Sequence, residues 1–129
     1  MKKHLLALAF LLISLLTACG SSALPAVSPD RLQVIEYGGT QQTITSLVTN
    51  PEKIQTLYTT LAALPGVPPF QACLTIGGPS YDLTFFKDGK VVVKVQASRD
   101  GCGTITLTQD DQRQPDDHFW VLLTQTIQS

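Results

Sequence analysis

The chain has 129 residues and a formal net charge of −1, with nine Lys and Arg against ten Asp and Glu. This balance gives no indication of nucleic-acid binding, which relies on a clustered basic face. The length allows one small domain.

The first residues have the three-part layout of a secretory signal. Lys2, Lys3 and His4 form a positive head, and Leu5–Leu16 is an apolar run interrupted by one serine. Crossing a bilayer takes about 20 apolar residues, so this run is too short for a permanent span. Residues 1–18 are therefore predicted to be an export signal that is cleaved.

The four residues Leu16-Thr17-Ala18-Cys19 resemble the lipobox of bacterial lipoproteins. The resemblance implies cleavage behind Ala18 and a diacylglycerol, with palmitate-like chains, on the thiol of Cys19. It also implies a lipid-anchored protein of the cell membrane or outer membrane that faces the extracytoplasmic side. The alternative is an ordinary signal peptide followed by a coincidental cysteine.

The mature chain is predicted to contain a tether and one domain. Residues 19–29 combine the lipidated cysteine with small residues and prolines that have no periodicity, which indicates a flexible tether. Residues 30–129 form the domain. Without the leader, seven basic residues remain against ten acidic ones.

The domain begins with a predicted hairpin and a helix. The strands Asp30–Tyr37 and Gln41–Thr49 flank a glycine pair, which favours a turn. Asn50 is a suitable N-cap and Pro51 a suitable first helical residue. The apolar residues that follow recur at helical spacing and predict one buried stripe, formed by Ile54, Leu57, Tyr58, Leu61 and Leu64.

After the helix the chain is predicted to form a proline-rich loop and a second hairpin. Phe70 is expected to be tucked under that loop. In the hairpin, a three-residue loop Lys87-Asp88-Gly89 would pair Phe85 with Val91 and leave one wholly apolar face. A two-residue loop would instead mix apolar and charged side chains, so the three-residue loop, with Gly89 in the left-handed conformation, is preferred.

A fifth strand and a closing helix complete the prediction. Thr104–Thr108 alternates as a strand, Gln109–Pro115 is expected to be a polar loop, and Asp116 or Asp117 can cap the helix. Its predicted buried side chains are Phe119, Trp120, Leu123 and Ile127. The expected fold is α+β: an antiparallel sheet of about five strands in ββαβββα order, with the helices packed on one face.

Two cysteines remain in the mature chain, Cys73 and Cys102. An exported protein meets an oxidising compartment, so a structural disulfide is the prediction. A redox pair or a metal site is the alternative. The meander topology supports the disulfide because it brings both cysteines to one end of the sheet.

The charged residues suggest few chemical sites. Asp110, Asp111, Asp116 and Asp117 are a weak candidate for a Ca²⁺ site, although they lack the order of a calcium loop. Lys87, Lys90 and Lys94 could meet anionic lipid or wall polymer, but such lysines usually keep an edge strand soluble. His118 has no histidine neighbour. No catalytic residue and no cofactor are expected.

The leading functional prediction is a non-enzymatic lipoprotein of the cell envelope, with a binding or structural role toward an envelope protein or a wall component. The chain is similar in general character to small envelope lipoproteins. The first alternative is a lipid-anchored inhibitor of a secreted hydrolase. Lysozyme inhibitors of this kind are similar in size, anchoring and disulfide use, but they are largely β-barrels, so no inhibitory residue is transferred. The second alternative is a metal-dependent enzyme that uses the Asp110–Asp117 cluster.

Overall fold

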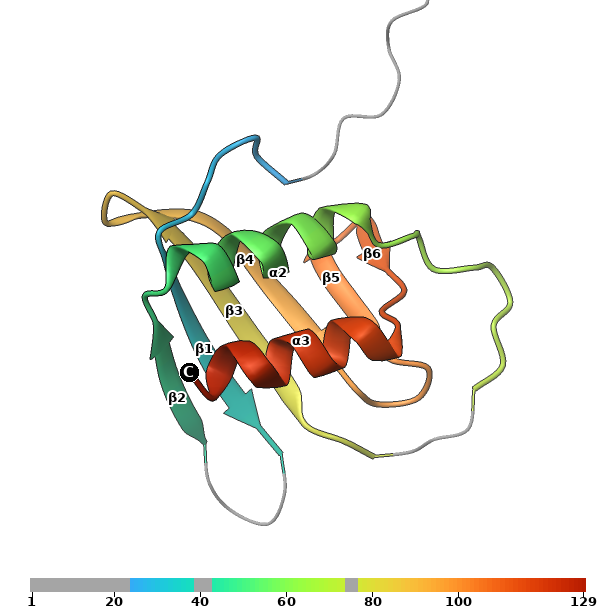
Figure 1. Ribbon diagram of the computed structural model, residues 1–129. Coiled ribbons are helices and arrows are strands. Elements are labelled where there is room, and N and C mark those ends of the chain that lie inside the picture. Colours follow the sequence, from blue (N-terminus) through green and yellow to red (C-terminus); the bar gives the residue numbers. More distant parts are fainter. Residues whose placement is uncertain (1–23, 39–42, 74–76) are drawn as a thin grey trace, which may run out of the picture.

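In the computed structural model, residues 24–38, 43–73 and 77–129 are described. The predicted signal peptide and Cys19 lie outside these ranges. The described residues form an open antiparallel sheet with two helices over one face (Figure 1). The predicted α+β class is confirmed, with a 6-stranded sheet where about five strands were expected.

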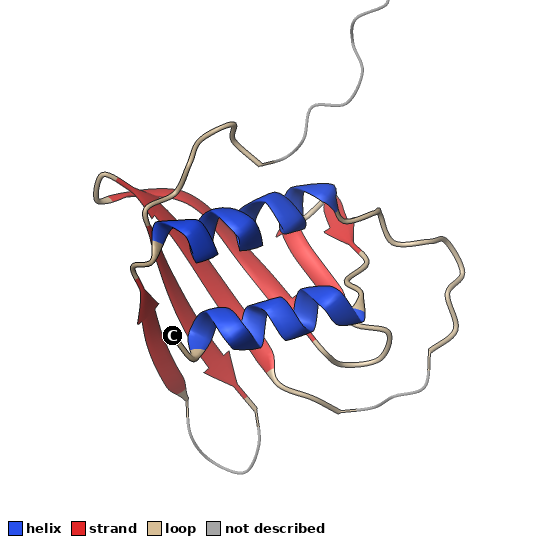
Figure 2. Cartoon of the chain, in the orientation of Figure 1, coloured by secondary structure: helices blue, strands red, loops and turns tan. Residues whose placement is uncertain are grey.

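The strands are β1 (Arg31–Tyr37), β2 (Ile44–Val48), β3 (Ser80–Lys87), β4 (Lys90–Ser98), β5 (Thr104–Thr108) and β6 (Asp111–Arg113). Their order across the sheet is β2-β1-β3-β4-β5-β6, and every neighbouring pair is antiparallel. The helices α2 (Pro51–Ala63) and α3 (Asp117–Ile127) lie side by side and run in opposite directions (Figure 2). None of the described helices has the length and apolar character needed to span a membrane.

Both helices begin where the sequence predicts. The Asn50 side chain accepts a hydrogen bond from the Lys53 amide at 3.1 Å, which caps α2. The Asp116 carboxylate accepts one from the Phe119 amide at 2.8 Å, which caps α3. These local bonds satisfy amides that have no partner inside the helix.

The apolar stripes of the two helices form the core against the sheet. The predicted α2 stripe is buried along its whole length, and Phe119, Trp120 and Leu123 are buried on α3. Ile127 is only partly buried. Full burial of such a side chain contributes roughly 1.5–3 kcal/mol, so this layer supplies most of the driving force for folding. The sheet residues that meet it are Leu32, Val34, Val48, Tyr81, Leu83, Phe85, Val95, Ala97, Ile105 and Leu107.

The turn of the second hairpin differs from the prediction. Lys87 pairs with Lys90, so the turn has two residues, Asp88 and Gly89, rather than three. Their φ angles are 51° and 76°. Two successive positive φ angles are typical of a type I′ turn, whose twist matches that of the flanking strands.

The register of this hairpin also differs from the prediction, but its apolar face is retained. Phe85 pairs with Val93 rather than Val91, and Leu83 pairs with Val95. A register shift next to Phe85 inserts one extra residue into β4. This bulge restores the alternation that a two-residue turn alone would have reversed. The prediction was wrong in the turn because the bulge cannot be read from the alternation.

We expect Gly89→Val to lower the free energy of unfolding by about 1–2 kcal/mol, because the left-handed conformation is costly for a residue with a Cβ atom. The φ angle of Gly89 is 76°. Thermal unfolding followed by circular dichroism measures the effect. Gly66→Val is the matched control, since a Cβ atom there has nothing within 4 Å and its φ is not positive. Equal melting temperatures for the two variants would contradict the assigned turn.

The sixth strand, β6, lies in the segment that was expected to be a polar loop. It pairs with β5. Arg113 holds it in place, because its guanidinium donates to the Leu64 carbonyl at 2.9 Å and pairs with Asp111. The contact with Leu64 joins residues 49 positions apart, so a polar three-residue strand gives no sequence signal of its own.

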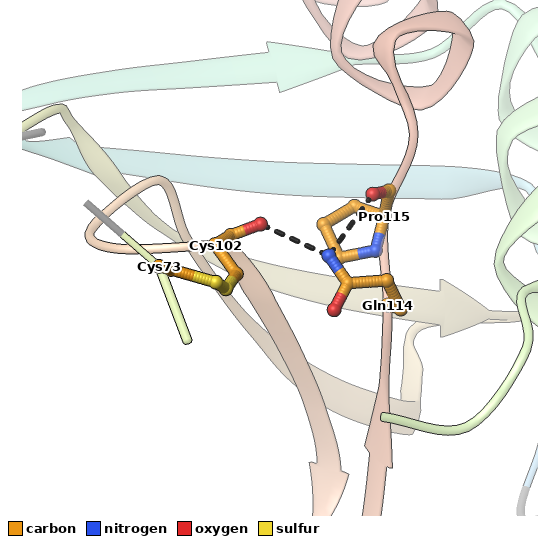
Figure 3. The surroundings of a disulfide bond; sticks show 4 residues. All are labelled: Cys73, Cys102, Gln114 and Pro115. Atoms are coloured by element: carbon orange, nitrogen blue, oxygen red, sulfur yellow. Dashed lines mark hydrogen bonds between the residues drawn. A yellow bond between two sulfur atoms is a disulfide. The ribbon is translucent and has the colours of Figure 1, made fainter. Parts of the chain in front are cut away.

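Cys73 and Cys102 form a disulfide, with 5.1 Å between their Cα atoms, as predicted. The bond joins the loop after α2 to the β4–β5 turn. Gln114 reinforces this end, since its side-chain amide donates to the Cys102 carbonyl at 2.9 Å (Figure 3). The Gln114 backbone amide donates to the Pro65 carbonyl at 2.8 Å. One end of the domain is therefore closed by a covalent bond and a small hydrogen-bond network.

Phe70 is exposed rather than tucked under its loop. Its relative exposure is 103% and its φ is 60°. The prediction was wrong because the core cluster is built from α2, α3, the sheet and Leu24, and Phe70 is not among its members.

Part of the predicted tether belongs to the domain. Leu24 is 5% exposed and joins the core cluster. The Tyr58 hydroxyl donates a hydrogen bond to the Pro25 carbonyl at 2.7 Å. Within the predicted tether of residues 19–29, Leu24 and Pro25 therefore contact the domain, while residues 25–28 are exposed.

Candidate functional site: the open face of the sheet

The two helices cover one face of the sheet and leave the other uncovered. Along each strand, residues next to core residues point to this second face. The cross-strand register aligns some of them into a row across all six strands, in the order Thr45, Ile35, Asp82, Gln96, Thr106 and Gln112. Neighbouring strands are about 4.8 Å apart, so the row places one side chain at each such step. We call this surface the open face.

A hollow of about 560 Å³ occupies the middle of the open face. Eight of the fourteen residues that line it are polar or charged. They come from β1, β3, β4 and β5 and the residue after β5: Gln33, Asp82, Thr84, Lys94, Gln96, Thr106, Thr108 and Gln109. The other six are apolar: Ile35, Leu83, Phe86, Val91, Val95 and Leu107.

The hollow holds one charge of each sign, Asp82 and Lys94. At its rim, a hydrogen bond with Asp82 raises the pKa of the Tyr37 hydroxyl above its ordinary value. The Arg31 guanidinium lies over the Phe86 ring, 5.7 Å from the ring centre. The site therefore combines neutral hydrogen-bonding groups with an anion, a cation and aromatic surface.

The residue types in the hollow define what it can offer a ligand. The side chains that line the hollow include no histidine or cysteine. Threonine and glutamine side chains instead offer both donors and acceptors to a ligand.

Two of the four aspartates considered as a metal site, Asp111 and Asp116, have other partners. A hydrogen bond from Arg113 lowers the pKa of Asp111, and Asp116 caps α3. Asp117 lies in the first turn of α3 and Asp110 in the β5–β6 turn. Within residues 24–38, 43–73 and 77–129, no three His, Cys, Asp or Glu side chains are grouped to hold a metal ion. The alternative of a metal-dependent enzyme has no ligand set in this part of the chain.

The three lysines noted in the sequence have different surroundings. Lys87 and Lys90 face each other at the hairpin turn, and Lys87 Nζ lies 3.8 Å from a carboxylate oxygen of Asp30. Lys94 lines the hollow on the open face. His118 is exposed in the first turn of α3, in the helix layer.

Sequence reasoning did not identify the open face as a site. The available signal was the alternation in β3, where Asp82 and Thr84 stand between Tyr81, Leu83 and Phe85. That alternation predicts a solvent-facing side but does not say whether another layer covers it. No protein-family model, curated protein or solved structure matches this chain, so its function has to be argued from its own residues.

Proposed function

We propose that this protein is a lipid-anchored, non-enzymatic protein of the bacterial cell envelope that binds a partner through the open face. The observation that carries the binding role is the row of hydrogen-bonding side chains left uncovered by both helices. The lipobox-like Leu16-Thr17-Ala18-Cys19 carries the anchoring role. The partner is an envelope protein or a component of the wall.

The position of Leu24 supports a lipid anchor on one side of the domain and a binding surface on the other. Leu24 is buried in the core cluster, which lies between the sheet and the helices. Leu24 therefore fixes the start of the described chain in the layer between the sheet and the helices. Leu24 is five positions after Cys19, and five extended steps reach at most about 17 Å. The bilayer would then lie near the helix side, and the open face would point away from it.

The loop before the disulfide favours inhibition of a secreted hydrolase as a second candidate. Phe70 is fully exposed on this loop. The loop is tied at one end by the Val67 amide, which donates to the Gln112 carbonyl at 3.3 Å, and at the other by the Cys73 disulfide. An exposed aromatic side chain on a tethered loop can act as an anchor in a partner's pocket.

One crosslinking experiment separates these candidates. A photoreactive benzoylphenylalanine is placed in the full chain at Gln96, on the open face, at Phe70, or at Val121. Val121 is 53% exposed on α3 and is the matched control. We expect an adduct in native cells from position 96 and none from position 121. Co-sedimentation with purified wall material tests the wall component, with Gln96→Arg expected to weaken it at least tenfold and Val121→Arg expected to leave it unchanged.

The outcomes are distinct. An adduct from position 70 alone would favour the hydrolase inhibitor. Absence of adducts from positions 70 and 96, together with co-sedimentation that is absent or unaffected by Gln96→Arg, would overturn binding through the open face.

A further inference from the structure

The two edge strands of the sheet, β2 and β6, differ strongly in how well they are protected against pairing with another strand. The β6 edge is three residues long and carries the Asp111 and Arg113 ion pair. Beyond it, Gly66 forms a bridge with Arg113 and the Val67 amide bonds to the Gln112 carbonyl. Short length, charge and a covering loop are the usual protections of an edge strand.

Within residues 24–38, 43–73 and 77–129, no charged side chain of β2 and no covering loop protects the β2 edge. Its sequence, Ile44-Thr45-Ser46-Leu47-Val48, contains no charged residue and no proline, and its pairing with β1 is regular. Ile44 is 53% exposed and Leu47 is 61% exposed. Among the described residues, no strand pairs with the outer side of β2. Such an edge is a template for a further strand.

We propose that β2 pairs with β2 of a second copy of this chain, antiparallel and centred on Ser46. In this register Ile44 lies opposite Val48 of the second copy, and Thr45 lies opposite Leu47 of the second copy. The strand is therefore compatible with itself: apolar β-branched residues meet on the helix side, and small serines meet at the centre. No like charges oppose each other, and one register covers both exposed apolar side chains.

The pairing joins two sheets into one. A two-fold axis through the centre of the β2 pair, perpendicular to the sheet, keeps both helix layers on one side and both open faces on the other. Leu47 and Ile35, which belong to the open face, would then lie close to the junction in each copy. The inference concerns β2 alone and does not depend on the proposed lipid anchor or on a ligand of the open face.

Crosslinking through an introduced cysteine tests this register. Residues directly opposite in an antiparallel pair have Cα atoms about 4.5–5.5 Å apart, which is within the range of a disulfide. Ser46→Cys in the full chain is therefore expected to give a covalent dimer under mild oxidation, at twice the mass of the single chain. Val121→Cys, also exposed but on α3, is the control and is expected to stay single.

A second substitution makes the test specific. Leu47→Lys, added to Ser46→Cys, places a charge beside the junction and is expected to reduce the dimer at least tenfold. Under reducing conditions its far-UV circular dichroism spectrum should match that of Ser46→Cys, because Leu47 is 61% exposed in the single chain and its replacement leaves the fold intact. Absence of the Ser46→Cys dimer, or equal dimer from Val121→Cys, would overturn the proposal. An adduct of Ser46→Cys with a different protein, in place of the dimer, would also overturn it and identify a foreign strand as the occupant.

Discussion

Reduction of the Cys73–Cys102 disulfide is expected to lower the free energy of unfolding by about 3.5 kcal/mol in the chain-entropy model. The two cysteines are 29 residues apart, and the loop between them includes β3 and β4. Without the bond, the unfolded chain regains the freedom of this loop. For a domain of this size, the loss corresponds to a fall in melting temperature of roughly 15–25 °C. Thermal unfolding by circular dichroism, with and without reductant, measures it.

The double variant Cys73→Ser/Cys102→Ser is the control for this experiment. Its melting temperature should be low in both conditions and should not respond to reductant. A wild-type protein whose melting temperature is the same with and without reductant would show that the bond contributes little to stability. In that case the hydrogen bond from Gln114 to the Cys102 carbonyl would hold this end of the domain together in place of the disulfide.

Cys19→Ala is expected to remove the protein from the membrane fraction almost completely. A single acyl chain holds a protein only marginally, whereas two or more chains, at about 0.8 kcal/mol per buried methylene, make release slow. All of this binding energy depends on one thiol. Intact-mass spectrometry of the wild type should find a chain that begins at Cys19 and carries the mass of the acyl groups. The variant should have no acylated form.

The disulfide variant serves here as the matched control for loss of a cysteine. Cys73→Ser/Cys102→Ser should remain in the membrane fraction with the same acyl mass, because neither thiol is next to the cleavage position. A wild-type chain that is full length and unacylated would contradict the lipobox interpretation of Leu16-Thr17-Ala18-Cys19. The binding role of the open face would then need a test outside the envelope.

Local chemistry explains why the helices were predicted well. An N-cap acts within three residues, as Asn50 with Lys53 and Asp116 with Phe119 show. An apolar stripe is visible in the sequence as apolar residues that recur at helical spacing, and the α2 stripe is buried as expected. The pairing of Cys73 with Cys102 could also be predicted, because only two cysteines remain once the leader is removed.

Features that depend on distant contacts were missed. The bulge beside Phe85 corrects the register of a two-residue turn, and alternation alone cannot reveal it. β6 exists because Arg113 reaches the Leu64 carbonyl, a residue 49 positions away. Leu24 was assigned to a tether because its sequence neighbours are small residues and prolines, yet it is buried in the core.

The sequence by itself determined the α+β class, the two helix starts, the buried stripe of α2 and the disulfide partners, because each follows from spacing or from covalent options within the chain. Only the tertiary structure decided which sheet face stays open, which edge is protected and where Phe70 points. These properties depend on what lies above a strand or beside it. A strand's own residues show that it has two faces and two sides, but whether another element covers them is settled only when the whole chain packs.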